Sequence, residues 1–402
     1  MRCAIVYPLF ALYRLPIFQA LVDTQTDDLE FCVYFDPNHK SSIKQAQPDL
    51  SQGKKWRIVK NIYFPFHFVW QRGVWRVALG REFQSIILLG DAYIVTNWII
   101  ALLARLRGKR VFFWTHGLYG NESRLKLLVR LAFYRLANGL FLYGNSSKRM
   151  LIENKFSPER IYVIYNSLDF EKQKAVARGL DPVELEKTKR QLFPSSSEAP
   201  ILIFIGRLTA RKQLGLLVEA CHRLAFKEHY VNVLFVGEGS ELNSLKSLVK
   251  KYQLENQVVF AGPRYEEEEI AELMCASALC VSPGDIGLTA MHALAYGIPV
   301  VTHDDFPAHG PEFEAIVPGF NGEFFEKGNV DSLVEKIEPW LFSDERQSGE
   351  DLKKRCTLVI EKFFNPGFQK KVIEQAIKGI PAEPVADRLI ADPFNETVEA
   401  TK

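Results

Sequence analysis

The residues best suited to chemistry are glycines and cations that follow short apolar runs. Gly206 and Arg207 come directly after the run 201–205, and Lys212 lies a few residues further on. A glycine lets an anion approach the backbone closely, and Arg and Lys can neutralise the charge of a diphosphate. The segment therefore favours a diphosphate site. The alternative is an ordinary strand–helix turn with solvated cations.

Two further glycine-rich segments follow apolar runs in the same way. Gly237 ends the run 231–236, and another segment opens a helical pattern over 288–296. The members of that second segment are Gly284, Asp285, Gly287, Leu288 and Thr289. Free backbone N–H groups and the dipole at a helix start can hold phosphate oxygens. Each turn alone is also consistent with no ligand, but three in one half of the chain reinforce one another.

A histidine offers a different kind of chemistry. His116 follows the apolar run 111–115 and precedes Gly117, which places it at the carboxyl end of an expected strand. Ligands of open α/β sheets bind at that edge, so His116 can orient a bound group. A structural histidine bonded to nearby backbone is the alternative.

Potential metal ligands also gather near residue 303, but their spacing matches no common metal site. They are His303, Asp304, Asp305, His309 and Glu312. No Asp-x-Asp sequence ends an expected strand. The six cysteines are scattered and mostly sit in apolar runs, which favours free thiols in a reducing compartment. The sequence thus predicts no resident metal.

Alternating strands and helices must position these residues. Apolar runs over 4–7, 31–35, 85–89, 111–115 and 139–143 predict strands in the first half, and runs over 201–205, 231–236, 258–260, 278–281 and 299–302 predict strands in the second. Helical patterns separate many of them, which is typical of parallel sheets. A chain of 402 residues exceeds one ordinary core, and 171–200 is expected to be a linker with one helix.

The charge is distributed unevenly. Residues 54–149 hold 17 Lys/Arg and three acids, a local net of +14, although the whole chain carries only +2. Aromatic residues over 63–70 and a basic, apolar helical pattern over 124–135 lie in this region. They favour contact with an anionic membrane, the alternative being a buried helix with a solvated basic face. A nucleic-acid partner is not expected, because no binding module is present.

No segment reaches the ~20 uninterrupted apolar residues of a membrane-spanning helix. The apolar start of the chain is interrupted by Arg14 and has no small-residue cleavage site, so a buried first strand is expected rather than a signal peptide.

Residues 201–325 resemble the donor-binding domain of the retaining family 4 glycosyltransferases, which have the GT-B fold. The resemblance rests on Gly206-Arg207-Leu208 with Lys212, and on Gly287-Leu288 followed by Gly297-Ile298-Pro299-Val300-Val301. In the first half, 165–169 and 114–117 resemble the segment that closes the N-terminal domain and the strand end that often carries a His.

The sequence departs from this family at two positions. The family signature has two glutamates eight positions apart, which fall here on Gly284 and His292. By the resemblance, the first glutamate contacts the donor sugar and the second the nucleotide ribose. His292 can still bond a ribose hydroxyl or a phosphate, and Asp285, Glu312 or Glu314 can supply a carboxylate.

The resemblance implies an α/β fold of GT-B type, with two Rossmann-like domains facing each other across a cleft. Residues 1–170 are expected to bind the acceptor, joined by a C-terminal helix at about 366–385; residues 180–365 are expected to bind the donor, and 386–402 to form a mobile tail. The implied catalytic group comprises His116, Arg207, Lys212 and Asp285. The implied donor site comprises Gly206, Arg207, Lys212, Gly237, Gly284, Asp285, Gly287, Leu288, Thr289, His292 and Glu312.

The implied reaction is a metal-independent transfer of a sugar from a UDP- or GDP-sugar, with retention, to a lipid-linked or saccharide acceptor. Arg207 and Lys212 take the place of a divalent ion, so no cofactor is expected. Surface polysaccharide synthesis (lipopolysaccharide, O-antigen, capsule or exopolysaccharide) at the cytoplasmic face of the membrane is the expected setting. The alternatives are a nucleotide-sugar 2-epimerase of the same fold and a non-catalytic donor-binding partner of another transferase.

Overall fold

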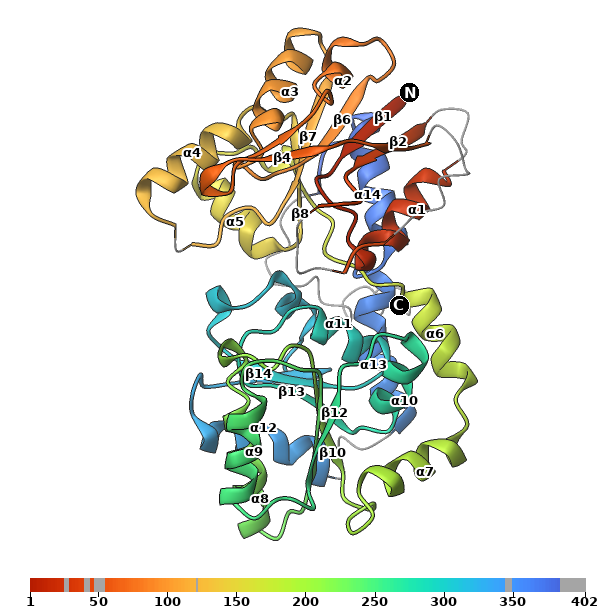
Figure 1. The fold of residues 1–402 in the computed structure, drawn as a ribbon, viewed down its shortest axis with the longest axis vertical. Helices are drawn as coiled ribbons and strands as arrows, with labels where there is room; N and C mark the ends of the chain where they lie inside the picture. The colour runs from red at the N-terminus through yellow and green to blue at the C-terminus, as the bar shows by residue number, and fades with distance from the viewer. Residues whose placement is uncertain (25–28, 40–43, 47–54, 121, 344–348, 384–402) are drawn as a thin grey trace, which may run out of the picture. The chain divides into compact units, whose positions relative to one another are not determined.

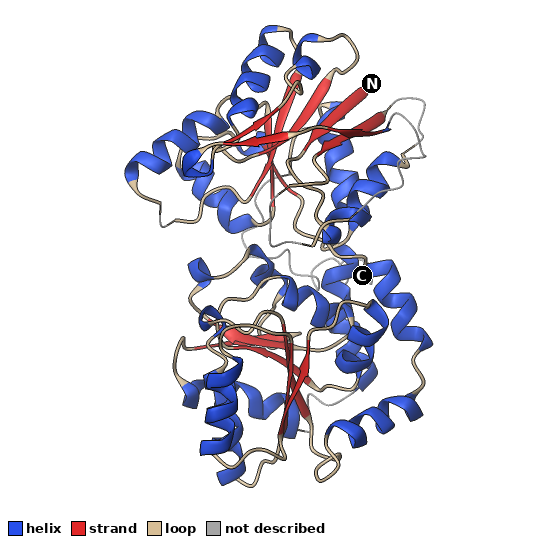
Figure 2. Ribbon diagram, viewed as in Figure 1, coloured by secondary structure: helices blue, strands red, loops and turns tan. Residues whose placement is uncertain are grey.

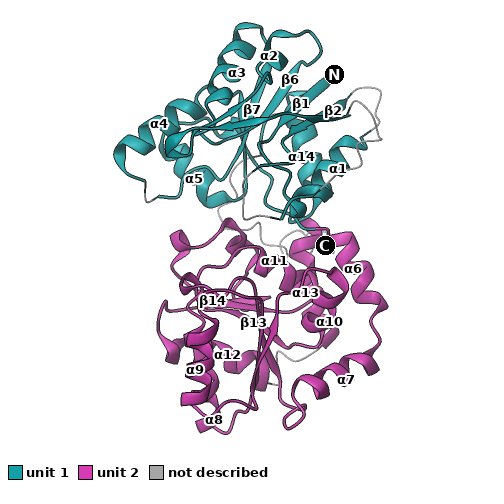
Figure 3. Cartoon of the chain, in the orientation of Figure 1, with its two compact units in different colours: residues 1–168, 363–391 teal, residues 169–362, 392–402 magenta. Residues whose placement is uncertain are grey.

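The chain folds into two compact α/β units (Figures 1 and 3). Unit 1 comprises residues 1–168 and 363–391, and unit 2 comprises residues 169–362 and 392–402. The computed structural model describes residues 1–24, 29–39, 44–46, 55–120, 122–343 and 349–383. The expected tail 386–402 lies outside this described part.

Unit 1 is built on a seven-stranded parallel sheet with the order β3-β2-β1-β6-β7-β8-β9. Its central strands are apolar runs buried on both faces, as a parallel sheet covered by helices requires. The strand order reverses between β1 and β6, which makes their carboxyl ends the topological switch point. The strands are β1 (Arg2–Val6), β2 (Glu30–Phe35), β3 (Trp56–Ile58), β6 (Ser85–Leu89), β7 (Arg110–Thr115), β8 (Gly139–Leu142) and β9 (Ile161–Val163).

Helices cover both faces of this sheet (Figure 2). One buried cluster joins helices α1 and α14 to Ile5 and Phe141, and another joins α3 and α4 to Ile86 and Phe113. Gln369 anchors α14, because its Nε2 donates to the carbonyl oxygen of Tyr165 at 2.6 Å. The helices are α1 (Leu15–Val22), α2 (Arg76–Leu79), α3 (Val95–Leu106), α4 (Arg124–Tyr134), α5 (Asn145–Glu153) and α14 (Pro366–Lys378).

The aromatic segment of unit 1 forms a hairpin, which the strand–helix alternation did not predict. β4 (Asn61–Tyr63) and β5 (Val69–Gln71) pair antiparallel, and Phe66 in the connecting loop is 83% exposed. Phe64 and Phe68 in the same loop are also exposed. The aromatic residues thus lie on the surface rather than in the core.

Unit 2 is built on a six-stranded parallel sheet with the order β12-β11-β10-β13-β14-β15. Its strands are β10 (Ile201–Ile205), β11 (Asn232–Val236), β12 (Val258–Gly262), β13 (Leu279–Ser282), β14 (Val300–His303) and β15 (Gly322–Phe325). Its helices include α8 (Gly215–Phe226), α9 (Leu242–Lys251), α10 (Glu267–Cys275), α11 (Leu288–Ala295), α12 (Val330–Phe342) and α13 (Gly349–Lys362). A buried cluster around Phe204, Phe235 and Val281 ties α8 and α12 to the sheet.

The polar stretch 171–200 was expected to be a linker with one helix, and that expectation is wrong. It contributes two helices, α6 (Phe170–Gly179) and α7 (Pro182–Leu192), each begun by an aspartate cap. On α7, Thr188 Oγ1 donates to the Glu272 carboxylate of α10, so the helix belongs to unit 2. Unit 2 therefore begins at Asp169 rather than near 180.

Candidate functional site

Three neighbouring strands of unit 2 end in glycine-containing turns at one edge of the sheet. Gly206 follows β10, Gly237 follows β11, and Gly284 follows β13 closely. Because the sheet order is β11-β10-β13, these turns are adjacent, and the order reverses between β10 and β13. The carboxyl edge at such a reversal is where open α/β sheets bind ligands. The sheet thus gathers residues that lie far apart in the sequence.

Gly237 has to be a glycine, because its backbone almost touches that of Gly206. A Cβ at Gly237 would lie 1.9 Å from the carbonyl oxygen of Gly206, and its φ of +142° is one that side chains disfavour. The N–H of Gly206 in turn donates to the carbonyl oxygen of Val236 at 2.9 Å. The two turns form one surface on which an anion can meet the main chain.

A lysine and an aspartate join the first turn to the third. Lys212 Nζ donates to the carbonyl oxygen of Asp285 at 2.6 Å and lies 3.2 Å from Asp285 Oδ1. Arg211 Nη2 lies 2.9 Å from Asp285 Oδ2, and the N–H of Asp285 donates to the carbonyl oxygen of Arg211 at 3.3 Å. The Lys212 side chain is only 17% exposed. Its cation is therefore held in place before any ligand arrives.

Gly284 cannot carry a side chain in this arrangement. A Cβ there would lie 2.0 Å from the carbonyl oxygen of Arg211 and 2.6 Å from the Cα of Lys212. These are main-chain atoms, which cannot move aside as a flexible side chain can. A glutamate at this position would be incompatible with the Lys212–Asp285 contact.

Two histidines hold the third turn from the other side. The N–H of Ile286 donates to His309 Nδ1 at 3.0 Å, and the N–H of Gly310 donates to the carbonyl oxygen of Ile286 at 2.8 Å. His309 Nε2 lies 2.8 Å from the carbonyl oxygen of His303, which can only accept. His309 is therefore the neutral tautomer with its proton on Nε2. Burial lowers the pKa of His309 to about 4, which agrees with this assignment.

His303 packs flat on His309, with ring centroids 3.9 Å apart, and its Nδ1 accepts the N–H of Asp305 at 3.1 Å. Burial lowers the pKa of His303, and the nearby Lys327 acts in the same direction. Both nitrogens of His309 and the Nδ1 of His303 thus bond backbone groups, in their own loop and in the glycine-rich turn. Their geometry is that of a support for the glycine-rich turn.

A buried carboxylate lies beside the same turn. Glu312 is 5% exposed, and its Oε2 would be 3.8 Å from a Cβ built on Gly287 and 2.5 Å from one built on Gly310. Glu314 is 1% exposed on the same short helix, over Pro311–Ala315. Of the expected substitute carboxylates, Asp285 and Glu312 both border the glycine-rich turn, from opposite sides.

The start of α11 completes this cradle, the term we use for the turns at Gly206, Gly237 and 284–289. Gly287 caps α11, Leu288 is its first residue, and Thr289 Oγ1 donates to the carbonyl oxygen of Ile205 at 2.9 Å. That bond fixes the helix start against the end of β10. The Arg207 side chain is exposed, and no hydrogen bond or ion pair ties that side chain to another residue in the described ranges. It is free to turn toward a ligand.

One ring nitrogen of His292, Nδ1, contacts residues outside the glycine-rich turns. Its Nδ1 accepts from Gln173 Nε2 of α6 at 3.1 Å and lies 4.0 Å from Glu267 Oε1 of α10. Tyr296 Oη also donates to Glu267. Burial lowers the pKa of His292, with Glu267 opposing the shift. The remaining nitrogen, Nε2, is the one that a nucleotide could use.

His116 lies in unit 1, at the mouth of a pocket of about 460 Å³. Its ring is sandwiched between Tyr119 and Tyr143, with centroids 6.0 and 4.7 Å away. Desolvation lowers the pKa of His116, and the charges of Arg14 and Arg130 add to the effect. A neutral imidazole at the carboxyl edge of β7 is thus available to accept a proton or a hydrogen bond.

Helix α4 forms one wall of the pocket that we call the His116 pocket. Leu125, Lys126, Val129 and Arg130 line it together with Asp91. The exposed face of the helix continues outward through Leu125 and Leu128, which are 73% and 64% exposed. The expected basic, apolar pattern is therefore a surface feature that runs directly into the pocket. None of the helices in the described ranges has the length and apolar character to cross a bilayer.

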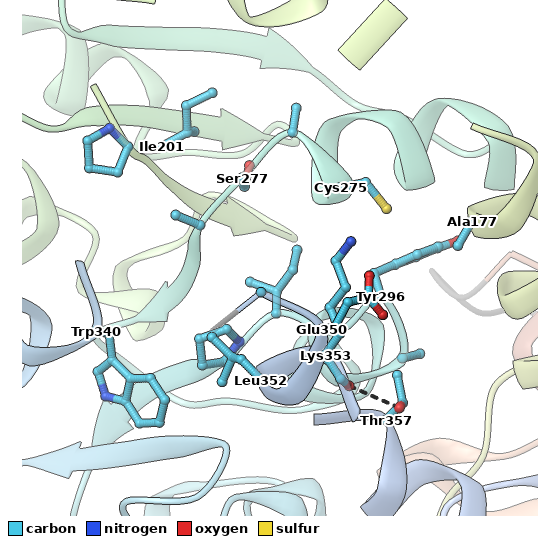
Figure 4. Close-up of a pocket in the computed structure, with 18 of the residues that line it drawn as sticks. Ala177, Ile201, Cys275, Ser277, Tyr296, Trp340, Glu350, Leu352, Lys353 and Thr357 are labelled. Atoms are coloured by element: carbon cyan, nitrogen blue, oxygen red, sulfur yellow. Dashed lines mark hydrogen bonds between the residues drawn. The ribbon is translucent and has the colours of Figure 1, made fainter. Parts of the chain in front are cut away.

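Unit 2 has another hollow, of about 970 Å³, at the opposite edge of its sheet (Figure 4). Ile201, Ser277 and Pro299, which line it, precede or begin β10, β13 and β14. Trp340 and Leu352 supply apolar walls, and Lys353 and Glu350 supply charges. Because it opens at the amino ends of the strands, it is not part of the cradle.

Several of these residues escaped the sequence analysis. Gln173 stood in the segment expected to be a linker, and nothing in the spacing of Gln173 or Glu267 points to His292. Arg14 looked like an interruption of an apolar start. Only Asp91 could have been found from the sequence. It lies beside a glycine, Gly90, just after an expected strand, and His116 lies beside Gly117 in the same way.

Comparison with known proteins agrees with the geometry of unit 2. Residues 186–356 match the model of the family described as Glycosyl transferases group 1. This segment is therefore similar to a group 1 glycosyltransferase domain. The match contains Gly206, Lys212, Gly284, Asp285 and His309, and thus the whole cradle.

Similar sequences extend over more of the chain. N-acetyl-alpha-D-glucosaminyl L-malate synthase of Bacillus anthracis is 25% identical over 333 residues, 75% of this chain and 81% of that enzyme. Lipopolysaccharide 1,6-galactosyltransferase of Salmonella typhimurium is 23% identical over 230 residues, which is 56% of either protein.

Solved structures show the fold. The crystal structure of Anabaena HepE in complex with UDP superposes with a TM-score of 0.68 at 18% identity, covering 94% of this chain and 100% of that one. The fold is the two-domain α/β fold of the GT-B glycosyltransferases, as the resemblance implied.

Proposed function

We propose that this protein is a glycosyltransferase that takes a sugar from a UDP- or GDP-sugar. The observation that carries the proposal is the cradle, where three adjacent strand ends present main chain and a fixed lysine to one point. A diphosphate offers the negative charge that this arrangement suits. The UDP complex of Anabaena HepE, which has the same fold, supports a nucleotide diphosphate as the ligand class.

The leaving diphosphate is the group that the cradle stabilises. As the bond from the anomeric carbon to the diphosphate oxygen breaks, negative charge grows on that oxygen. Lys212 lies ready in the cradle, the N–H groups at the start of α11 point along its dipole, and the free Arg207 closes on the phosphates. These positive groups can do without a divalent ion, so we propose metal-independent transfer with retention.

A carboxylate has to bind the sugar hydroxyls from a position other than 284. Gly284 leaves no room for a side chain, so Asp285 or Glu312 takes this role. Asp285 is already paired with Lys212 and Arg211, and both cations gain an alternative partner when phosphate arrives. Release of Asp285 to the sugar would then accompany donor binding.

The acceptor binds at the His116 pocket in unit 1. His116 is neutral there and can accept the hydrogen bond of an acceptor hydroxyl as its oxygen bonds the anomeric carbon. The exposed apolar and basic face of α4 favours an acceptor carried by a lipid, at an anionic membrane surface. The lipopolysaccharide galactosyltransferase among the relatives supports a surface polysaccharide as the product class.

The first test is the thermal stability of the protein with UDP, GDP, CMP and ADP, with and without EDTA. A ligand at 100 times its dissociation constant adds about 2.7 kcal/mol of stability. We expect one of UDP and GDP to raise Tm equally with and without EDTA. The matching radiolabelled nucleotide sugars are then assayed for transfer to lipid extracts. Failure of all four nucleotides to stabilise the protein would contradict the proposal.

A second candidate function is a non-catalytic, donor-binding partner of another transferase. The absence of room for a side chain at Gly284 favours it, because the sugar-binding carboxylate implied by the resemblance cannot stand there. This candidate predicts nucleotide-sugar binding with neither transfer nor slow hydrolysis. Hydrolysis of the donor by the isolated protein, abolished in Lys212→Ala, would exclude it.

A further inference from the structure

An arginine is enclosed by aromatic rings at the carboxyl edge of the unit 1 sheet. Arg14 immediately precedes α1 and is only 6% exposed. Its Cζ lies 5.4 Å from the ring centroid of Tyr7, 5.2 Å from that of Tyr13, 5.1 Å from that of Trp114 and 5.2 Å from that of Tyr143. A guanidinium among electron-rich faces is stabilised by cation–π attraction.

The hydrogen-bonding capacity of this cluster is mostly unused. Arg14 Nη2 donates to Tyr143 Oη. Arg14 Nη1 and Trp114 Nε1 are buried and have no hydrogen-bond partner among the described residues, whereas the Tyr7 hydroxyl interacts with that of Tyr143. Both of the unpartnered nitrogens can donate a proton. Unused hydrogen-bond donors around a cation can together bind an oxyanion.

The charge is equally uncompensated. No ion pair joins Arg14 to a carboxylate in the described ranges. A buried charge without an opposite charge is costly, and cation–π contacts recover only part of that cost. Such a charge is retained where an anion binds to it.

The cluster lies next to the His116 pocket. Tyr7 follows β1, Trp114 is near the end of β7, and Tyr143 follows β8, so all three mark the carboxyl edge of the sheet. The Tyr143 ring, which accepts from Arg14 through its hydroxyl, packs on the ring of His116 at 4.7 Å. His116 is exposed, and Tyr13 is partly exposed above the guanidinium. Tyr13, whose ring lies beside the guanidinium, is thus the partly exposed member of the cluster.

We propose that Arg14, with Trp114, binds an oxyanion, a phosphate or a carboxylate, carried by the acceptor. Rotation of Tyr13 opens the way, and the anion takes the free Nη1 of Arg14. The assignment of this group to an acceptor rests on the proposed function, whereas the anion site itself does not. An anchor here holds the acceptor beside His116.

The site is tested with small anions, so that neither donor nor acceptor is needed. The Arg207→Ala/Arg211→Ala/Lys212→Ala chain removes the cations that border the cradle. Its thermal stability is measured with methyl phosphate and with acetate, at constant ionic strength. We expect one of them to raise Tm by about 3 °C or more near saturation. The two anions distinguish a phosphate-bearing from a carboxylate-bearing acceptor.

Variants then locate the binding. In the same background, Arg14→Met is expected to abolish the Tm shift, and Arg14→Lys to weaken anion binding at least tenfold. The exposed Arg72 provides the matched control, Arg72→Met, which is expected to keep the full shift. An equal shift in Arg14→Met and the parent chain, or no shift in the parent chain, would overturn the proposal.

Crystals of the unmodified chain give a test that does not depend on the variants folding. Selenate is a tetrahedral oxyanion that anomalous diffraction can locate. We expect a selenate peak within hydrogen-bond distance of Arg14 Nη1. A selenate-soaked crystal with none at Arg14 would overturn the proposal, while nucleotide binding to unit 2 would still stand or fall on its own test.

Discussion

His309 accepts the backbone N–H of Ile286 on one ring nitrogen and donates to the carbonyl oxygen of His303 with the other. The glycine-rich turn at 284–287 thus depends on a side chain far along the sequence. This turn also holds the Asp285 carbonyl oxygen that accepts from Lys212. The histidine is therefore a positioning residue for the lysine of the cradle.

Two different replacements of His309 show how much its hydrogen bond with Ile286 contributes. His309→Asn places an amide oxygen near the position of Nδ1 and keeps the acceptor for Ile286, whereas His309→Ala loses it. We expect His309→Ala to weaken UDP or GDP binding about tenfold, the equivalent of one hydrogen bond, and His309→Asn to restore most of it. Calorimetric titration measures both. Equal affinity in the alanine variant and the wild type would show that the turn needs no such support.

The same histidine makes stability depend on pH. Its folded-state pKa of about 4 lies below the ordinary value of 6.5, so the neutral form favours folding and the unfolded chain takes up the proton first. His309 therefore contributes its stability above pH 6.5 and loses it as the pH falls toward 4. The loss is on the order of 2 kcal/mol after allowance for partial exposure. Urea unfolding at pH 7 and pH 5 should show a smaller difference in His309→Asn than in wild type.

Arg207 and Lys212 should differ in what their removal does to the free protein. Either alanine variant is expected to lower kcat on the order of 10²-fold if the side chain stabilises the leaving diphosphate. Arg207→Ala should leave Tm unchanged, because the side chain is exposed and touches no described partner, whereas Lys212→Ala should lower Tm by releasing the Asp285 turn. Transfer assays and thermal unfolding measure the two effects. Near-normal kcat in both variants would remove them from the mechanism.

A substitution of Gly284 tests whether nucleotide binding needs the close contact between this turn and the backbone of Arg211 and Lys212. Gly284→Ala places a Cβ 2.0 Å from the Arg211 carbonyl oxygen, so the turn has to move away from Lys212. Strained contacts of this kind cost about 1–3 kcal/mol, and nucleotide affinity should fall with them. Gly179→Ala is the matched control, because nothing lies within 4 Å of its added Cβ. Comparable Tm and nucleotide affinity in the two variants would contradict the described contact.

Structural features that depend on neighbouring residues in the sequence could be predicted more readily than features that depend on tertiary contacts. Apolar runs ending in glycine locate β10, β11 and β13, and the parallel sheet then brings Gly206, Gly237 and Gly284 together without further information. The hairpin around Phe66 was missed because aromatic residues there read as core or membrane surface rather than as two short strands. One of the two helices in 171–200 was missed because a polar composition resembles a linker, although the Asp181–Pro182 start of α7 signals a helix.

The roles of particular side chains required distances that no spacing supplies. His309 and Ile286 are joined only once β13 and β14, the fourth and fifth strands of the unit 2 sheet, are side by side. The environment of Arg14 is formed by Trp114 and Tyr143, which come from β7 and from the end of β8. Burial of a charge is a property of the assembled sheet, and it cannot be read from the residues around position 14.

The exposed face of α4 is predicted to bind anionic membranes. Replacement of Leu125 and Leu128 by Ser removes apolar area, and replacement of Arg124 and Lys126 by Gln removes charge. Each pair should weaken binding to anionic liposomes at least severalfold, because burial of apolar area and attraction to anionic lipid act together. Only the charge pair should abolish the dependence on salt. Co-sedimentation at low and high salt measures this, with nucleotide affinity as the control for unit 2. Liposome binding that is unchanged in both pairs would assign this surface to something other than a membrane.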